Sequence, residues 1–334
     1  MPLEISFIVF LIVINLVIIL NYKYLTNKIN VLDFPNEKRK IHSNPTPIFG
    51  GIIVFINIIF FLLFFFFFKF EILLDSFLLS ELKSLFYFFI IISSIFIIGL
   101  YDDKYTIKGI NRIILLTLFI YFSIVIDLNL EINELIFNLN NTVIPFEKGA
   151  RIFPTICFLV LIVSCNMGDG INLQSFLFNF FTFLGLYFIT ENLFIIVLLI
   201  SLVSFGILNF NGKIFLGDSG SYLLSFFLGF YFIKYYNYNY IDNVEVTILF
   251  LLFPIMDASR CIFTRLLNGR SIISADNIHL HYLLLNKIDY KKTILLMSFF
   301  YLGPFVFYVL NFNYYLFFVI SITLYIFLFL KFKS

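Results

Sequence analysis

Long apolar runs constrain the fold of this chain more than any other feature of its sequence. A helix of roughly 20 mainly apolar residues is long enough to cross the hydrocarbon of a bilayer. Hydrophobic residues make up 61% of the 334 residues and charged residues 13%, about half the charged share usual in soluble domains. A soluble domain of this length has no core large enough to hide so much apolar surface. The sequence therefore predicts an all-α protein embedded in a membrane.

Eleven runs meet this length within a few residues, and each predicts one membrane-spanning helix. They are 5–22, 48–68, 84–101, 111–127, 152–168, 176–190, 193–210, 219–235, 244–263, 294–311 and 313–330. Two of the runs are short and the last two are nearly continuous, so ten helices is the alternative. The first run lacks a basic leading segment and a small-residue cleavage site, which predicts a retained helix. Residues 1–334 are expected to form one polytopic domain.

The distribution of Lys and Arg predicts which loops face the cytoplasm. Sixteen of the 22 lie in segments 23–47, 102–112, 169–175, 211–218, 264–293 and 331–334. Five lie in the opposite loops, and Arg260 lies inside a span. Cytoplasmic loops carry an excess of these residues, so the first set is expected to be cytoplasmic. The N-terminus is then outside and the C-terminus inside.

Two acidic motifs interrupt the apolar runs on this side. GLYDDKYTIKG (99–109) places two adjacent carboxylates, Asp102 and Asp103, at the end of a run. NMGDGINL (166–173) places Asp169 between two glycines, three residues after Asn166. Taken alone, the second motif is explained at least as well by a polar helix end as by a binding site.

A third motif, KIFLGDSGSYLLSFFLG (213–229), places Asp218 between glycine and serine directly before a helix. Its carboxylate could be an N-cap of that helix. The alternative is a metal-ligating acid whose neighbouring amides, together with Lys213, face a phosphate. The spacing is not that of a P-loop.

A fourth motif, RLLNGRSIISADNIHLHYLLL (265–285), contains His279 and His281. On a helix two residues this far apart point to different faces, and no third ligand with zinc spacing is near, so zinc is disfavoured. With Arg265 and Asp276, the loop is better suited to phosphate, through guanidinium and imidazole donors.

The second predicted helix is preceded by a basic, proline-broken loop, DFPNEKRKIHSNPTPIFGG (33–51). Topology and anionic lipid alone account for a basic loop at this place. Taken together, however, the acid-, glycine- and histidine-bearing loops converge on one membrane face. Several carboxylates beside cationic side chains predict a divalent cation with phosphates, and Mg²⁺ is the cation that such oxygen ligands normally hold.

In this order the motifs resemble the polyprenyl-phosphate N-acetylhexosamine-1-phosphate transferases (glycosyltransferase family 4) over residues 33–282. The last motif favours the WecA/TagO-like branch over MraY. The resemblance implies a multi-pass enzyme of the inner (plasma) membrane. Such enzymes transfer a sugar-1-phosphate from a UDP-sugar to undecaprenyl phosphate and release UMP, which initiates a cell-surface glycan such as a wall polymer or O-antigen. The default donor is UDP-N-acetylglucosamine.

The resemblance also implies roles for individual residues. Asp218 and Asn166 would ligate Mg²⁺, with Mn²⁺ as the alternative. Asp102 and Asp103 would orient or deprotonate the lipid phosphate or assist the metal, and Asp169 would act on the nucleotide sugar. The residues that would bind the substrates are Lys38, Arg39, His42, Asn172, Lys213, Arg265, His279 and His281. The implied partners are a UDP-N-acetylhexosamine, undecaprenyl phosphate and the bilayer, without nucleic acid, and a homodimer is allowed.

The chain departs from the family pattern in two places: the first argues against a strictly acidic role at that position, and the second leaves the sugar open. Asn172 stands where WecA-like members carry a second Asp, and Asn277 and Tyr282 replace an Arg and a His of the last motif. Three other functions are the alternatives: a transporter or flippase of lipid-linked sugars, an MraY-like phospho-muramoyl-pentapeptide transferase, and a member that binds nucleotide sugar without turnover. Transport needs ionisable residues along a mid-membrane pathway, and here Asp257, Arg260 and little else lie within spans.

Overall fold

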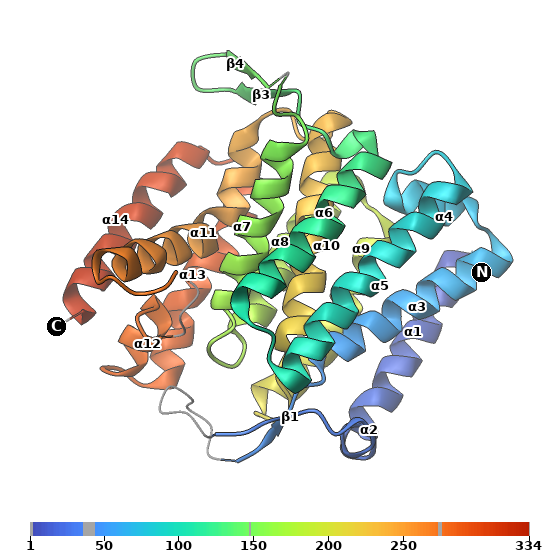
Figure 1. Ribbon diagram of the computed structural model, residues 1–334, viewed down its shortest axis with the longest axis horizontal. Helices are drawn as coiled ribbons and strands as arrows, with labels where there is room; N and C mark the ends of the chain where they lie inside the picture. Colours follow the sequence, from blue (N-terminus) through green and yellow to red (C-terminus); the bar gives the residue numbers. More distant parts are fainter. Residues whose placement is uncertain (1–2, 36–43, 147, 273–275, 334) are drawn as a thin grey trace.

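A helical membrane fold is what the computed structural model shows, and it describes residues 3–35, 44–146, 148–272 and 276–333 (Figure 1). Each of the eleven predicted ranges contains a helix. These helices are α1 (Leu3–Leu20), α3 (Gly50–Phe68), α5 (Leu82–Tyr105), α6 (Gly109–Ile126), α7 (Ile152–Met167), α8 (Gln174–Thr190), α9 (Leu193–Phe210), α10 (Gly217–Asn237), α11 (Val244–Leu267), α13 (Tyr290–Val309) and α14 (Tyr314–Phe332). The predicted all-α membrane fold is confirmed.

Eight of the helices in the described part of the chain are long and apolar enough to cross a membrane: α1, α3, α5, α6, α9, α11, α13 and α14. Helices α7 and α8 are apolar but shorter, and α10 is not among the eight. The number of crossings and the orientation therefore stay predictions.

Short elements connect the long helices. They are α2 (Tyr22–Ile29), α4 (Glu71–Phe77), a 3₁₀ turn (Leu128–Leu130) and α12 (Leu280–Leu285). Two antiparallel strand pairs were not expected: β1 (Leu32–Asp33) with β2 (Thr46–Pro47), and β3 (Glu134–Phe137) with β4 (Thr142–Pro145). Figure 1 shows β3 and β4 at one end of the helices and β1, α2 and α12 at the other. We call this second end the motif end.

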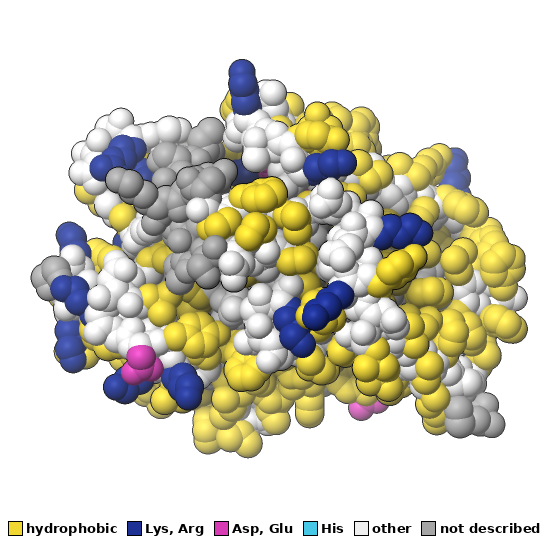
Figure 2. Space-filling model, turned by 90° about the horizontal axis from the view of Figure 1, so that it is seen from below, with side chains coloured by type: hydrophobic (Ala, Val, Ile, Leu, Met, Phe, Trp, Pro, Cys, Tyr) yellow, Lys and Arg dark blue, Asp and Glu magenta, His cyan; other side chains and the backbone are white. Residues whose placement is uncertain are grey.

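Charge is unevenly distributed over the motif end. Figure 2 views the molecule from that side and shows many Lys and Arg side chains with few Asp or Glu between them. Among the acids of the motifs, Asp102 is buried and Asp103, Asp169 and Asp218 are partly buried, so these acids are recessed.

Helix α10 is the centre of the fold. It is buried from Ser219 to Tyr235 and packs against α3, α5, α7 and α8. A helix enclosed by protein on all sides needs no lipid-facing stripe. Glycine, serine and tyrosine can therefore stand along α10, and these residues lower its hydropathy below that of the outer helices.

The outer helices α1, α6 and α14 show the opposite pattern. Most of their exposed side chains are apolar, among them Val13, Leu16, Ile114, Leu118, Leu316 and Val319. An apolar surface of this extent is stable in lipid and not in water. Protein surrounds α10, and an apolar surface suited to lipid surrounds the bundle.

Glycines let α3 and α5 approach the start of α10 at backbone distance. A Cβ at Gly99 would lie 2.4 Å from the Cα of Ser219, and a Cβ at Gly51 would lie 2.3 Å from the backbone nitrogen of Gly220. No side chain fits in either place, so both contacts fix where α10 begins relative to α3 and α5.

We expect Gly99→Ala to destabilise the protein, because the new methyl group meets backbone that cannot rotate away. The cost should be about 1–3 kcal/mol, as for overpacked cores. Thermal unfolding in detergent measures it as a lower midpoint. Gly149→Ala is the matched control, since a Cβ there meets nothing closer than 3.6 Å; equal midpoints for the two variants would contradict the packing argument.

Candidate active site

The first turn of α10 is held in place by the segment before the second long helix. The amide of Phe215 donates to the carbonyl of Pro47 at 2.9 Å, and the carbonyl of Phe215 accepts from the amide of Gly50 at 2.9 Å. Gly217 follows with φ of +79°, and a Cβ there would lie 2.2 Å from Ile48. The chain therefore turns sharply at a residue that must be glycine, and Asp218 enters the first turn of the helix.

Asp103 of α5, rather than Asp218, caps α10. Its Oδ1 accepts from the amide of Asp218 at 2.7 Å, and its Oδ2 accepts from the amide and hydroxyl of Ser219 at 3.1 and 2.8 Å. The first amides of a helix need such acceptors, and a carboxylate there also interacts favourably with the helix dipole. The alternative that Asp218 is the N-cap is thus wrong, and the Asp218 side chain is free for another role.

Asp102 points to different partners from its neighbour. Its Oδ1 accepts from the amide of Ile107 at 2.6 Å, and its Oδ2 accepts from Arg112 at 3.1 Å and from the hydroxyl of Tyr222 at 3.0 Å. The residue is only 5% exposed. The two adjacent acids therefore have different structural roles. Asp102 holds the α5–α6 turn, and Asp103 holds the start of α10.

Arg112 of α6 is a site residue that the sequence reasoning counted only toward topology. Its Nη1 lies 3.1 Å from Asp102 Oδ2 and 3.9 Å from Asp218 Oδ2, and its side chain is 27% exposed. The sequence offered one signal for this role: Arg112 is a basic residue in the first turn of a helix, ten residues after Asp102. It brings a fixed positive charge to the carboxylates.

Asn166 and Asp169 complete this cluster from the α7–α8 turn. The amide nitrogen of Asn166 donates a short hydrogen bond to Asp218 Oδ1. Asp169 Oδ1 accepts from the hydroxyl of Ser175. Burial raises the pKa of Asp169 to about 6, the Ser175 hydroxyl opposes that rise, and the charge of Asp103 adds to it. Three predicted motifs thus meet at the start of α10.

The donor atoms in this cluster fit a divalent cation. Asp218, Asn166 and Asp169 offer carboxylate and amide oxygens, which are the hard ligands that Mg²⁺ and Mn²⁺ take. Two carboxylates, Asp102 and Asp218, share one guanidinium here, so a bound cation would reduce the repulsion within the acidic cluster. Asp102 and Asp103 are engaged in hydrogen bonds that hold the site, and their roles toward a substrate stay predictions.

Asn209 is a second residue that sequence reasoning missed. It lies near the end of α9, where its Oδ1 accepts from the amide of Leu173 at 2.6 Å and its Nδ2 donates to the carbonyl of Ile214 at 2.9 Å. One side chain therefore ties the NMGDGINL turn to the loop before α10. A polar amide at the end of an apolar run was its only signal in the sequence.

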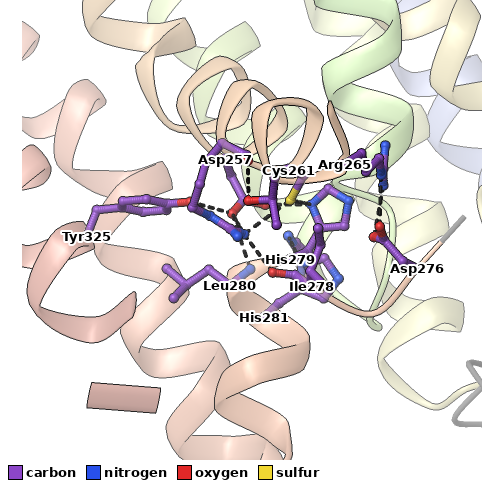
Figure 3. Close-up of polar contacts among 12 residues, drawn as sticks. Asp257, Cys261, Arg265, Asp276, Ile278, His279, Leu280, His281 and Tyr325 are labelled. Carbon is purple, nitrogen blue, oxygen red and sulfur yellow. Dashed lines mark hydrogen bonds and ion pairs between the residues drawn. The ribbon is translucent and has the colours of Figure 1, made fainter. Parts of the chain in front are cut away.

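The histidine motif forms a second cluster of polar contacts (Figure 3). Arg265 Nε and Nη2 donate to the two oxygens of Asp276 at 2.8 and 2.9 Å, and Nη1 donates to the carbonyl of Ile272 at 2.8 Å. Arg265 is 4% exposed. In this arrangement it holds the loop together, and its role toward a substrate stays a prediction.

The expectation that His279 and His281 point to different faces is wrong. His279 precedes α12 in extended conformation, so the pair does not share a helix. The two rings stack with centroids 5.5 Å apart and planes 10° apart. His281 is fully enclosed, and a Cβ on Gly170 would lie 2.0 Å from its Nε2. His281 thus packs tightly against the turn that carries Asp169.

The expectation that no third metal ligand lies near the histidines is also wrong. Ligand atoms of Asp257, Cys261 and His279 lie within 4.8 Å of one another. Arg260, however, donates from Nη2 to Asp257 at 2.9 Å and to Cys261 at 3.1 Å. A guanidinium already supplies the positive charge among these atoms, so zinc stays disfavoured.

The remaining predicted residues are placed less fully. The amine of Lys213 lies over the ring of Tyr22 at 5.1 Å. The backbone carbonyl of Asn172 accepts from the hydroxyl of Tyr290 at 3.0 Å. Lys38, Arg39 and His42 lie outside the described residues.

Comparison with known proteins bears on the family. A family model described as glycosyl transferase family 4 matches residues 85–236, which include both acids of GLYDDKYTIKG, the NMGDGINL turn and Asp218. A curated relative, the undecaprenyl-phosphate alpha-N-acetylglucosaminyl 1-phosphate transferase of Thermotoga maritima, is 25% identical over 280 residues. The match covers 81% of this chain and 78% of the relative. Both findings support the superfamily that the motifs resemble.

Asp103→Ala and Asp218→Ala should distinguish a residue that stabilises the fold of the site from a residue that is available to a ligand. Asp103→Ala leaves buried helix amides without an acceptor, which should cost about 1–3 kcal/mol of stability. Asp218→Ala removes one of several clustered like charges, so its midpoint should not fall. Thermal unfolding in EDTA measures both, and a larger loss for Asp218→Ala would contradict the assigned cap.

Asp169 should make stability depend on pH. Its pKa is raised from 3.8 to about 6 in the folded protein, so the folded state holds this proton more tightly than the unfolded state. The contribution is full below the unfolded pKa and is lost as the pH rises through about 6. In EDTA, wild type should lose stability relative to Asp169→Asn between about pH 4 and about pH 6. Parallel curves for the two proteins would contradict the raised pKa.

Proposed function

Because a glycosyl transferase family 4 region spans residues 85–236 of this chain, we propose that the protein is a membrane-embedded polyprenyl-phosphate sugar-1-phosphate transferase. The proposed donor is a UDP-N-acetylhexosamine, by default UDP-N-acetylglucosamine, and the proposed acceptor is undecaprenyl phosphate. The product would be an undecaprenyl-diphosphate sugar, with UMP released. The name of the Thermotoga maritima relative supports the acceptor and the sugar class.

One observation carries the proposal: Asp218, Asn166 and Arg112 meet at the start of a helix whose cap is supplied from elsewhere. Asp218 is bonded to Asn166 and lies 3.9 Å from Arg112, while Asp103 satisfies the helix amides. Carboxylate, amide oxygen and guanidinium together suit phosphate groups that arrive with a divalent cation.

The reaction is an exchange at phosphorus. An oxygen of the lipid phosphate forms a bond to the β-phosphorus of the UDP-sugar, and the bond from that phosphorus to the oxygen bridging to UMP breaks. The acceptor phosphate, with a second pKa near 6, is already largely dianionic at neutral pH and needs little deprotonation. The barrier is the approach of two anions, so catalysis depends on positive charge in the right place.

The residues of this chain divide that work. Asp218 and Asn166 would hold Mg²⁺ or Mn²⁺, which when bound supplies positive charge for the phosphates and the departing UMP. Arg112 adds a guanidinium that Asp102 and Asp218 orient. Asp169 would face the nucleotide sugar. The oxygens of Asp102 and Asp103 are engaged in hydrogen bonds, which favours a direct displacement over a phospho-enzyme.

The charged residues within α11 favour an enzyme over a transporter. Asp257 and Arg260 form an ion pair at 2.9 Å and are both engaged with Tyr325 of α14. These groups are engaged with one another and with Tyr325, which supports a structural role for the pair. We therefore propose catalysis at the motif end, facing the cytoplasm of the plasma membrane. A homodimer stays a prediction.

Release of UMP tests the function directly. Purified protein, undecaprenyl phosphate, Mg²⁺ and a panel of UDP-N-acetylhexosamines should yield UMP with at least one donor. EDTA should stop release and added Mg²⁺ should restore it. Asp218→Ala should lower the rate by at least about 10²-fold, because it removes the proposed metal ligand.

Asp75→Ala is the matched control, since Asp75 is an exposed acid in α4, outside the site. It should turn over like wild type. Wild-type turnover in Asp218→Ala would contradict the metal assignment. Absence of UMP from wild type with every donor would contradict the function itself.

A further inference from the structure

Asp257, inside α11, is surrounded by hydrogen-bond donors (Figure 3). Its Oδ2 lies 2.7 Å from Nδ1 of His279. Its Oδ1 accepts from the hydroxyl of Tyr325 at 2.7 Å and from Nη2 of Arg260 at 2.9 Å, with the amide of Leu280 at 3.2 Å. A carboxylate with a guanidinium and two further donors on one oxygen is held in its ionised form.

This environment decides which nitrogen of His279 carries the proton. An ionised carboxylate can only accept, so the hydrogen between Asp257 and His279 must belong to Nδ1. In the neutral ring, Nε2 then carries the lone pair. Nε2 has no hydrogen-bond partner in the described part of the chain. Asp257 therefore determines that Nε2 is the unprotonated nitrogen of His279.

His281 differs from His279 in every respect that matters here. Its Nδ1 lies 3.2 Å from Nε2 of Gln174, and its ring is fully enclosed. Burial lowers the pKa of His281 to about 3, with the nearby His279 adding to that effect and Asp257 opposing it. His281 supports the Gly170 turn and, by stacking, fixes the plane of the His279 ring.

The supporting network lies next to the transfer site. Asp257 lines a small cavity together with Gly168 and Ser175. Ser175 is also the residue that donates to Asp169. The carboxylate that fixes His279 is thus built against the same turn that carries Asp169 and Asn166.

We propose that Asp257 is a positioning residue for the transfer reaction: it holds His279 as the Nδ1–H tautomer, so that Nε2 is presented to the phosphate groups of the nucleotide sugar. Tyr325 and Arg260 hold the carboxylate in turn, which makes α14 part of the support. The inference rests on the function proposed above. It assigns a role to a charged residue within α11 that would otherwise be costly in a membrane helix.

The tautomer can be observed without any turnover. The chain contains three histidines, so a sample labelled with ¹⁵N-histidine gives few ring signals, and His281→Gln and His42→Gln assign them. In wild type, His279 should show a protonated Nδ1 and an unprotonated Nε2. Asp257→Asn should change that state, because its amide group can donate to Nδ1. An Nε2–H ring in wild type, or an unchanged ring in Asp257→Asn, overturns the proposal.

Kinetics then test whether Asp257 acts through His279. Asp257→Asn should lower kcat for UMP release by about 10²-fold, as supporting residues of reactive side chains commonly do. His279→Gln should lose a similar factor, and the double variant should lose no more than His279→Gln alone. Losses that multiply in the double variant would mean that Asp257 acts independently, and would overturn the proposal.

Cys261→Ser is the matched control for the network. Cys261 Sγ lies 3.3 Å from the same Nδ1, yet the proposal gives the thiol no role, so UMP release should stay within about twofold of wild type. A thiolate–metal absorption band on adding Cd²⁺ that Cys261→Ser abolishes would show a metal site instead and overturn the proposal. Lack of UMP release by wild type would refute the proposed function. The tautomer measurement does not depend on turnover, so it would still test whether Asp257 sets the protonation of His279.

Discussion

The hydrogen bonds from Asp103 to the first turn of α10 are the interaction on which the site depends. They join two positions 115 residues apart and satisfy the helix amides with a side chain from another helix. Because a carboxylate of α5 takes that place, the acid of α10 itself keeps its oxygens for Asn166, for the nearby Arg112 and for the proposed cation. Without the cap from α5, the first amides of α10 would lose these acceptors.

Close packing makes this arrangement possible. Gly51 and Gly99 bring α3 and α5 to backbone distance from α10. The short side chain of Asp103 can therefore reach the first amides of α10. The burial of α10 on every side holds its first turn still, while the outer helices meet the lipid. Catalytic groups held by buried elements are positioned better than groups on exposed loops. The packing of the outer helices around α10 thus produces both the lipid-facing surface and the recessed polar site.

Both polar clusters distribute charge in the same way. In each, an arginine donates to a carboxylate, and one member of the pair lies next to a second group. Arg112 donates to Asp102 and lies near Asp218, whereas Arg260 donates to Asp257, which also contacts His279. Pairing lowers the cost of placing ions at the edge of a membrane. It also leaves one group in each cluster, Asp218 in the first and His279 in the second, with an atom available for the proposed phosphate chemistry.

The local sequence determined that this protein lies in a membrane and where its helices fall. Apolar runs of membrane length are a local property, so all eleven ranges could be located, and Asn166, Asp169 and Asp218 could be selected from their motifs. Only the tertiary structure decided which acid caps α10, that Arg112 and Asn209 belong to the site, and that the ring of His279 is tied to Asp257. Those contacts join residues far apart in the chain, and a side chain's partner depends on packing that no local pattern encodes.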